Sequence, residues 1–382
     1  MIDATRGKPN ARQVALSEGL LAPISVDELQ AYKGADLLNY GGGEGLAEMK
    51  ALFASILDVQ PENVIVGGNS SLTMMFDMVS NLVNTGLWIP GKSKILCPSP
   101  GYDRHFTICE HLKLEMITIP MTQDGPDMDK AEEMVKDPNV AGIWCVPIFS
   151  NPQGCVYSAD TVRRLAEMKT ANPNFKILWD NAYAMHHFQG SRQTVPSILA
   201  ECTKNGYENR PILFTSFSKI TIPGAAVSCL AASVSFLDKV IRPRIFTQTI
   251  GPDKINQYRH IKMFNNLSDI ENHMAKHAEI LRPKFKLVDD MFKQCLSKTG
   301  ATFGSPDGGY FISVDTPPNK AKKVEALCKE SGLLITNAGA TFPYGKDPND
   351  SNIRFAPTFL SLEQLQQAAE IFCSAVSVAI KT

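Results

Sequence analysis

A lysine preceded by two serines stands just after a short apolar run in the middle of the chain. Residues 211–214 have the length and composition of a buried strand, and Ser216, Ser218 and Lys219 follow its end. In open α/β sheets, ligands bind beyond the carboxyl ends of the strands, so Lys219 is predicted to lie at a ligand site. An amine in that position can form a Schiff base with a carbonyl compound. The alternative for an isolated lysine is a solvated surface residue.

Four other loops carry polar or aromatic side chains, and each follows an apolar run that is predicted to be a strand. They are Gly68, Asn69 and Ser70 after 63–66, Tyr102 after 94–97, Asn151 after 142–149, and Asp180 with Tyr183 after 176–179. Taken one at a time, such residues have ordinary roles as helix caps, turn residues or packed loop anchors. In a doubly wound sheet, however, all five loops converge on one edge.

Together the five loops match the needs of one cofactor, pyridoxal 5'-phosphate. Small residues and hydroxyls at the start of a helix, as at Ser70, favour a phosphate. A carboxylate such as Asp180 keeps a pyridine nitrogen protonated, so that the ring acts as an electron sink. An aromatic side chain can cover the ring, amide and phenol groups can bond its phenolic oxygen, and Lys219 can receive its aldehyde. The combination therefore predicts a pyridoxal-phosphate site.

The elements that must position these groups alternate between strand and helix from residue 63 to about residue 231. Further along, the pattern predicts a long helix near 270–292, strands at 308–314, 333–336 and 352–356, and a helix near 319–331. A last helix begins after Ser361, where Ser361 and Gln364 form a capping box. The fold class predicted is α/β, a mostly parallel sheet flanked by helices, plus a smaller α+β domain.

The length of 382 residues exceeds what one hydrophobic core usually holds. The change of pattern after the long helix places a boundary there. We predict an N-terminal arm at 1–35 that belongs to the small domain, a large cofactor-binding domain at 36–285, and a small α+β domain at 286–382.

Composition restricts the partners and the compartment. The net charge is -1, with 44% hydrophobic and 20% charged residues and no basic block, which argues against nucleic-acid and anionic-membrane partners. No apolar run reaches membrane-spanning length, and the first residues lack the apolar core of a signal peptide. The nine cysteines are scattered and never spaced as Cys-x-x-Cys. They predict reduced thiols in the cytoplasm, without a metal site or a disulfide framework.

Several motifs resemble the signature of the fold type I pyridoxal-phosphate aminotransferases. They are Asn151-Pro152-x-Gly154, Asp180-x-x-Tyr183, Ser216-x-Ser218-Lys219, Arg354, Tyr40-Gly41-Gly42 and Gly308-Gly309-Tyr310-Phe311. The separations, 29 residues from Asn151 to Asp180 and 39 from Asp180 to Lys219, are also similar to that family's. At residues 5–9 and 249–254 the chain is similar to a divergent bacterial subgroup of aspartate aminotransferases.

The resemblance implies a role for each cofactor residue. Lys219 would hold the cofactor and move the proton between Cα and C4′. Asp180 would pair with the pyridine nitrogen, and His105 would support Asp180. The other roles implied are Tyr183 and Asn151 on the phenolic oxygen, Tyr102 over the ring, and Ser216, Ser218, Gly68, Asn69 and Ser70 around the phosphate. Tyr40 would reach the phosphate from a neighbouring subunit, as in a homodimer with shared active sites.

The resemblance also implies a substrate with two carboxylates. Arg354 would grip the α-carboxylate as a bidentate fork, with Asn151 and Gly7 at the substrate. Candidates for a second cation, facing the distal carboxylate, are Arg6, Arg242 and Arg244, each with surface solvation as the alternative. One departure is that many relatives carry a phosphate-binding arginine where this chain has residues 224–228, which contain no cation.

The predicted activity is transfer of an amino group between aspartate and 2-oxoglutarate, with amino acids and 2-oxo acids as small-molecule substrates and a second copy of the chain as partner. A pyridoxal-phosphate enzyme of other specificity or reaction, such as a β-lyase or a decarboxylase, would share the cofactor residues. A catalytically silent pyridoxal-phosphate-binding regulator is the third alternative. Such regulators carry a fused helix-turn-helix domain, whereas here the aminotransferase-like pattern begins within the first residues, and Lys219 is present.

Overall fold

The computed structural model describes residues 1–188, 190 and 192–381. At its centre lies an eight-stranded sheet with the order β2-β9-β8-β7-β6-β3-β4-β5. The strands are β2 (Val64–Val66), β3 (Lys94–Ser99), β4 (Glu115–Thr122), β5 (Gly125–Pro126), β6 (Val140–Cys145), β7 (Lys176–Asp180), β8 (Pro211–Ser216) and β9 (Ser228–Ala231). The five strands from β8 to β4 are parallel. Strand β9 is antiparallel to both β8 and β2, so β2 and β8 point the same way and end at the same edge.

Helices cover both faces of this sheet because successive residues of its strands are buried on opposite sides. In β7, Ile177 and Trp179 belong to one hydrophobic cluster and Leu178 belongs to the other. Strands with such a continuous apolar run are typical of a parallel sheet that has helices on both faces. The covering helices include α3 (Ala47–Leu57), α4 (Ser71–Asn84), α5 (Asp103–His111), α6 (Met128–Met134), α7 (Ala159–Glu167) and α8 (Ile198–Lys204).

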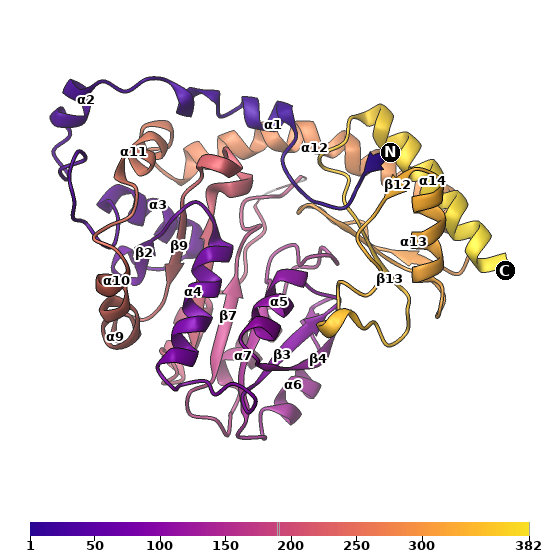
Figure 1. The fold of residues 1–382 in the computed structure, drawn as a ribbon, viewed down its shortest axis with the longest axis horizontal. Helices are drawn as coiled ribbons and strands as arrows, with labels where there is room; N and C mark the ends of the chain where they lie inside the picture. Colours follow the sequence, from indigo (N-terminus) through magenta and orange to yellow (C-terminus); the bar gives the residue numbers. More distant parts are fainter. Residues whose placement is uncertain (189, 191, 382) are drawn as a thin grey trace.

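A 30-residue helix, α12 (Leu267–Leu296), follows α9 (Val234–Phe236), α10 (Arg242–Gln248) and α11 (Lys254–Met263). It runs along the molecule and packs against the last helix, α14 (Leu362–Lys381) (Figure 1). The capping box predicted at the start of α14 is confirmed, because the backbone N–H of Gln364 donates to Ser361 Oγ at 3.1 Å and the Gln364 side chain accepts from the N–H of Ser361.

Two small sheets complete the fold. The first, β10-β11-β13, is antiparallel and consists of β10 (Thr302–Phe303), β11 (Ile312–Asp315) and β13 (Asn352–Phe355). In the second, β1 (Ile2–Asp3) pairs with β12 (Leu333–Leu334), next to α13 (Ala321–Glu330). After β1, the N-terminal segment runs past α1 (Ala11–Ala15) and along α12 to α2 (Val26–Ala31), at the far end of the molecule (Figure 1). The exact domain boundaries given above stay a prediction.

A disulfide between Cys295 and Cys373 joins α12 to α14, and it corrects the expectation that all thiols are reduced. The two cysteines are 78 residues apart and meet only because the two helices pack together, which cysteine spacing cannot reveal. The other seven cysteines are free, and six of them are buried.

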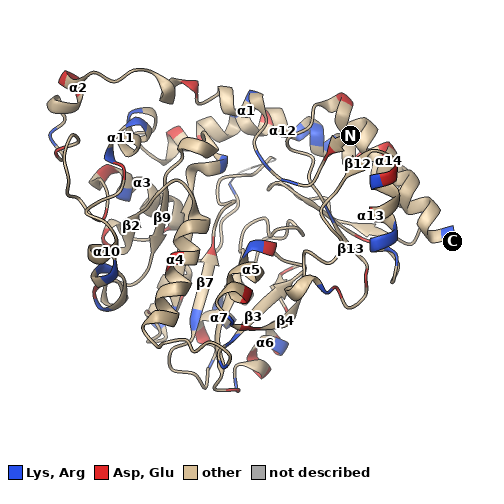
Figure 2. Ribbon diagram, viewed as in Figure 1, with Lys and Arg blue, Asp and Glu red and all other residues tan. Residues whose placement is uncertain are grey.

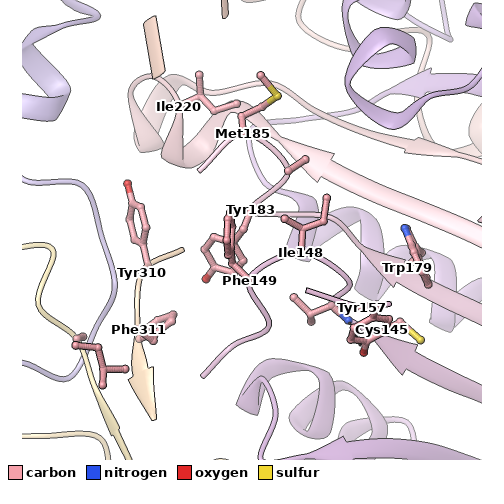
Figure 3. Packing of buried hydrophobic residues seen from close by; sticks show 14 of the residues in the cluster. Cys145, Ile148, Phe149, Tyr157, Trp179, Tyr183, Met185, Ile220, Tyr310 and Phe311 are labelled. Carbon is pink, nitrogen blue, oxygen red and sulfur yellow. Dashed lines mark hydrogen bonds between the residues drawn. The ribbon is translucent and has the colours of Figure 1, made fainter. Parts of the chain in front are cut away.

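Two strand predictions differ from the structure by more than two residues at one end. The predicted strand 142–149 stops at Cys145. The predicted strand 308–314 starts only at Ile312, because the backbone before it pairs with another segment. Gly308 forms an isolated antiparallel bridge with His187, and the N–H of Gly309 donates to the carbonyl oxygen of His186 at 2.7 Å. A Cβ on Gly308 would lie 2.3 Å from the carbonyl oxygen of His186 and from the ring of Phe149, and Gly309 has a φ of +83°. Figure 3 shows Phe149 beside Tyr183, with Tyr310 and Phe311 facing them from the neighbouring segment.

Lysine and arginine residues are interspersed with aspartate and glutamate residues over the helices (Figure 2). Among the described helices, none combines the length and the apolar character that crossing a bilayer requires.

A chain of buried polar groups ties the N-terminal segment to the backbone beside Lys219. The amide of Gln13 donates to the Tyr310 hydroxyl at 3.0 Å and lies 3.0 Å from His277 Nδ1. The ring of His277 lies 3.1 Å from that of His273, whose Nε2 donates to the carbonyl oxygen of Ile220 at 2.9 Å. Burial lowers the pKa of His277 to about 3.

Acid should therefore destabilise the fold through His277. Below the ordinary histidine pKa of 6.5, His277 is protonated in the unfolded chain. In the folded chain it stays neutral until the pH falls to about 3. The stability present above pH 6.5 is thus lost as the pH falls, by about 1.4 kcal/mol per pH unit for one such group. Urea unfolding between pH 7.5 and 4.5 should show a shallower loss for His277→Gln than for the parent. His111→Gln, at an exposed histidine, should match the parent. Equal slopes in all three proteins would contradict this prediction.

Candidate active site

The carboxyl ends of the central strands enclose a cavity of about 120 Å³. It is lined by Ser70, Ser71, Leu72, Met75, Tyr102, Val146, Asn151, Asp180, Ala182, Tyr183, Ser216, Ser218 and Lys219. Residues from all five loops singled out in the sequence therefore meet in one place. This follows from the topology, because the strands that precede those loops point the same way.

Asp180, the last residue of β7, is buried and has one oxygen fixed and the other unpaired. His105 Nε2 donates to Asp180 Oδ2 at 3.0 Å. The His105 ring is stacked on Trp144 with a centroid distance of 4.0 Å and an interplanar angle of 3°, so it cannot turn away. Asp180 Oδ1 has no hydrogen-bond partner among the described residues. Since buried polar atoms are normally paired, this oxygen is placed to accept from a bound N–H group.

Lys219 lies across the cavity from Asp180, in a 3₁₀ turn (Phe217–Lys219) that directly follows β8. Its Nζ lies 5.0 Å from the centre of the Tyr183 ring. Burial lowers the pKa of the lysine amine, and the charge of Asp180 partly opposes this effect. A lowered pKa leaves more of the amine neutral, which is the nucleophilic form. Burial also raises the pKa of the Tyr183 hydroxyl, which therefore stays a proton donor.

Hydroxyls and a helix N-terminus form one end of the cavity. Ser216 Oγ donates to Ser218 Oγ at 3.0 Å, and Ser218 Oγ donates to the carbonyl oxygen of Asn69 at 2.9 Å. Ser70 caps the 14-residue helix α4 by accepting from the N–H of Leu72. Among the described residues that line this cavity, Lys219 is the only cation. This end of the cavity can therefore bind an anion through hydroxyls, N–H groups and the dipole of α4, without an arginine.

Arg354, in β13, lies in a second cavity of about 510 Å³ that shares Tyr102 with the first. Its Nη1 donates to Asp103 Oδ1 at 2.8 Å and lies 3.3 Å from Asn151 Oδ1. Its Nε lies 3.3 Å from Thr336 Oγ1, and its guanidinium lies over the Phe311 ring at 4.8 Å. The cavity is lined by Thr5, Arg6, Gly7, Tyr102, Asp103, Arg104, Phe311, Ile335, Thr336, Asn337, Ala340 and Arg354.

Gly7 allows the N-terminal segment to form a wall of this second cavity. A Cβ at position 7 would lie 2.5 Å from the Phe311 ring, so only glycine lets the backbone pass this close. Arg6 thereby lines the same cavity as Arg354, although the two residues are far apart in the sequence.

The other two arginine candidates lie elsewhere in this chain. Arg242 is paired with Glu44 and Asp238. Arg244 lies 3.3 Å from Asp77 and lines a separate cavity of about 280 Å³. Their action on a neighbouring subunit's substrate stays a prediction. Three residues predicted to contact the phosphate also lie outside the first cavity, and their role stays a prediction. Gly68 and Asn69 are exposed, and Tyr40 is 81% exposed.

Sequence reasoning missed Asp103, Thr336 and Ser71 as parts of these cavities. Ser71 and Asp103 directly follow Ser70 and Tyr102, so position next to a site residue at a helix start was the available signal. Thr336 gave no such signal, because its contact with Arg354 depends on how β12 and β13 pack. Among the described residues, no group of three or more histidine, cysteine or acidic side chains is placed to hold a metal ion.

The comparisons with known proteins agree with this geometry. The chain is 40% identical to an aspartate aminotransferase of Corynebacterium glutamicum over 386 residues, covering 99% of this chain and 89% of that protein. The crystal structure of an aspartate transaminase from the same organism superposes with a TM-score of 0.94 at 39% identity, covering 99% of this chain and 91% of that one. The α-aminoadipate aminotransferase LysN from Thermus thermophilus, complexed with N-(5'-phosphopyridoxyl)-L-leucine, has a TM-score of 0.81 at 21% identity, covering 100% and 93%, and shows the shared fold.

Fold and comparisons together define the class as a fold type I aminotransferase, a class that uses pyridoxal phosphate. More narrowly, the chain belongs to the family described as aspartate amino-transferase, whose model matches residues 1–382.

Proposed function

We propose that this aminotransferase exchanges an amino group between aspartate and 2-oxoglutarate. The observation that carries the proposal is the second cavity, in which Arg354 and Arg6 both lie and which adjoins the cavity of Lys219 and Asp180. The described lining of this cavity holds three arginines (Arg6, Arg104 and Arg354) and one carboxylate (Asp103), and this excess of two cations suits a substrate with two carboxylates. The aspartate aminotransferase of C. glutamicum, 40% identical, supports the same choice of substrate.

The side chains around the first cavity fit pyridoxal phosphate. Asp180 Oδ1 is unpaired among the described residues, as the partner of a pyridine N–H must be, and Lys219 lines the same cavity. The hydroxyls of Ser216 and Ser218 suit the phosphate, and Asn151 and Tyr183 suit the phenolic oxygen. When bound, the cofactor supplies an electron sink for the negative charge that forms at the substrate Cα.

The protein's own groups then have defined tasks. Asp180 holds the proton on the pyridine nitrogen, and His105 fixes the carboxylate for that task. Lys219 Nζ, whose pKa burial lowers, would take the proton from the substrate Cα and return it. Arg354 holds the α-carboxylate as a bidentate fork and so aims the Cα–H bond at the lysine.

We propose a homodimer in the cytoplasm, with amino acids and 2-oxo acids as partners and without nucleic acid or membrane. Several large apolar side chains near the start of α3 and the end of α10 are exposed in the single chain, as expected of a surface that a second copy covers. They include Tyr40, Phe246 and Ile250. Tyr40 would reach the phosphate of the neighbouring subunit. Seven of the nine cysteines are free, which favours the cytoplasm, whereas the Cys295–Cys373 disulfide does not.

Amino-group transfer distinguishes this proposal from its alternatives. Purified protein loaded with pyridoxal phosphate should convert aspartate and 2-oxoglutarate into oxaloacetate and glutamate. Single-turnover spectra with a panel of amino acids should respond fastest to the dicarboxylic ones. Release of pyruvate and ammonia would indicate a β-lyase, release of carbon dioxide a decarboxylase, and cofactor binding without turnover a regulator.

Loss of the second cation should affect dicarboxylic substrates alone. Arg6 is exposed in the single chain, so its contact with a carboxylate becomes buried only when substrate fills the cavity. A buried arginine–carboxylate contact contributes about 1.5–3 kcal/mol, so Arg6→Ala should lower kcat/KM for aspartate roughly tenfold to a hundredfold. The value for alanine should hardly change. Arg12→Ala, at an exposed arginine on α1, should behave as the parent.

The same assay on Arg242→Ala and Arg244→Ala tests the rival candidates. A selective loss in one of these, with Arg6→Ala unaffected, would transfer the role to that arginine, acting on a neighbouring subunit. If none of the three variants loses activity selectively, the preference for aspartate is wrong and only the aminotransferase assignment remains.

A further inference from the structure

Asp103 lies between two arginines at the edge of the substrate cavity. Its Oδ1 lies 2.8 Å from Nη1 of Arg354, and its Oδ2 lies 3.9 Å from Nε of Arg104. The three side chains differ in exposure, at 7% for Arg354, 28% for Asp103 and 47% for Arg104. The buried guanidinium that is expected to bind the substrate is therefore already paired with a carboxylate of the chain itself.

This pairing uses a donor that a substrate needs. A bidentate contact requires two parallel N–H groups of one guanidinium. In Arg354, Nη1 donates to Asp103 and lies near Asn151, while Nε lies near Thr336. A substrate carboxylate that binds through Nη1 must displace Asp103 or share the charge with it.

We propose that Asp103 competes with the carboxylate of the substrate for Arg354 and thereby sets the affinity of this subsite. The inference rests on the proposed function, because it takes Arg354 as the residue that binds the substrate carboxylate. Arg104 makes the exchange feasible, since a displaced Asp103 keeps a cation beside it. Before substrate enters, the pair also spares Arg354 the cost of an uncompensated buried charge.

The competition predicts a gain of affinity when the carboxylate is removed. The apparent dissociation constant of a ligand rises as the fraction of protein that is competent to bind falls. If Arg354 is free of Asp103 about a tenth of the time, removing the competitor tightens carboxylate binding about tenfold. A residue that only supports the fold or aims Arg354 would give a loss instead.

Calorimetric titration of the pyridoxal-phosphate-loaded protein with succinate, an unreactive dicarboxylate, tests this inference. Asp103→Asn should bind succinate about tenfold more tightly than the parent. Asp103→Ser, which also places a small polar residue at the helix start, should show the same gain. Glu110→Gln removes one negative charge from an exposed position of the same helix, α5, and should leave the affinity unchanged.

Unchanged or weaker binding in both Asp103 variants, with normal binding by the parent, would overturn this inference alone. An equal gain in Glu110→Gln would also overturn it, because the effect would then come from net charge. If the parent binds no succinate, the proposed function and this inference both fail.

Discussion

Replacing Lys219 with alanine should abolish amino-group transfer and leave the fold intact. The lysine is the one cation among the described residues that line the cofactor cavity. The contact of its amine that the structure shows is with the Tyr183 ring at 5.0 Å, so its removal should cost the fold little. Loss of the group that moves the substrate proton should lower kcat by at least about 10³-fold. Cofactor binding should persist through the serines, Asp180 and the aromatic residues, and dialysis followed by absorbance measures it.

A chemical test accompanies this variant. Borohydride treatment of the parent protein should attach the cofactor irreversibly to Lys219, and peptide mapping locates the adduct. Lys239→Ala, at an exposed lysine, should keep full activity and the same adduct. An adduct on any other lysine would remove the basis of the whole site assignment.

Asp180→Ala should cost several orders of magnitude in rate. The unpaired Oδ1 of Asp180 is the feature that suits a protonated pyridine nitrogen, and without the carboxylate the electron sink is lost. We expect the barrier to rise by about 4 kcal/mol or more, which corresponds to about 10³-fold in kcat. Cofactor affinity should fall less, because the phosphate contacts remain. Steady-state kinetics and cofactor titration on the same preparation measure both quantities.

The control for this variant is Asp290→Ala, which removes an exposed carboxylate on α12. It should retain the kcat of the parent. An Asp180→Ala protein with more than a tenth of the parental kcat would show that another group protonates the ring.

The meeting of the five loops at the cavity of Lys219 could be predicted from the sequence, because the residues concerned are placed by local rules. Each lies directly after an apolar strand, and parallel strands bring their carboxyl ends together without any detailed knowledge of packing. Long helices could also be predicted from strong local patterns. The long polar and apolar stretch predicted α12, and the capping box predicted the start of α14. Predicted strand boundaries were wrong where contacts between distant backbone segments determine them. At Gly308, the close approach to His186 delays the start of β11.

The substrate cavity could be predicted only in part. Arg354 was found through its position in a familiar motif, but its contact with Asp103 joins residues 251 apart. Such contacts depend on how the three-stranded sheet lies against the eight-stranded one. The Cys295–Cys373 disulfide and the β1–β12 pair could not be predicted for the same reason, because each joins two segments that no periodic pattern links.

The pairing of β1 with β12 has a consequence for assembly on the ribosome. The residues that line the cofactor cavity all lie between positions 70 and 219. Those of the substrate cavity include Thr5, Arg6 and Gly7 as well as residues up to Arg354. Since Ile2 pairs with Leu333, the N-terminal segment has no partner strand until residue 333 has been synthesised and has left the exit tunnel. The two adjoining cavities are therefore completed at different times, and the one that contains Arg354 is the last to be completed.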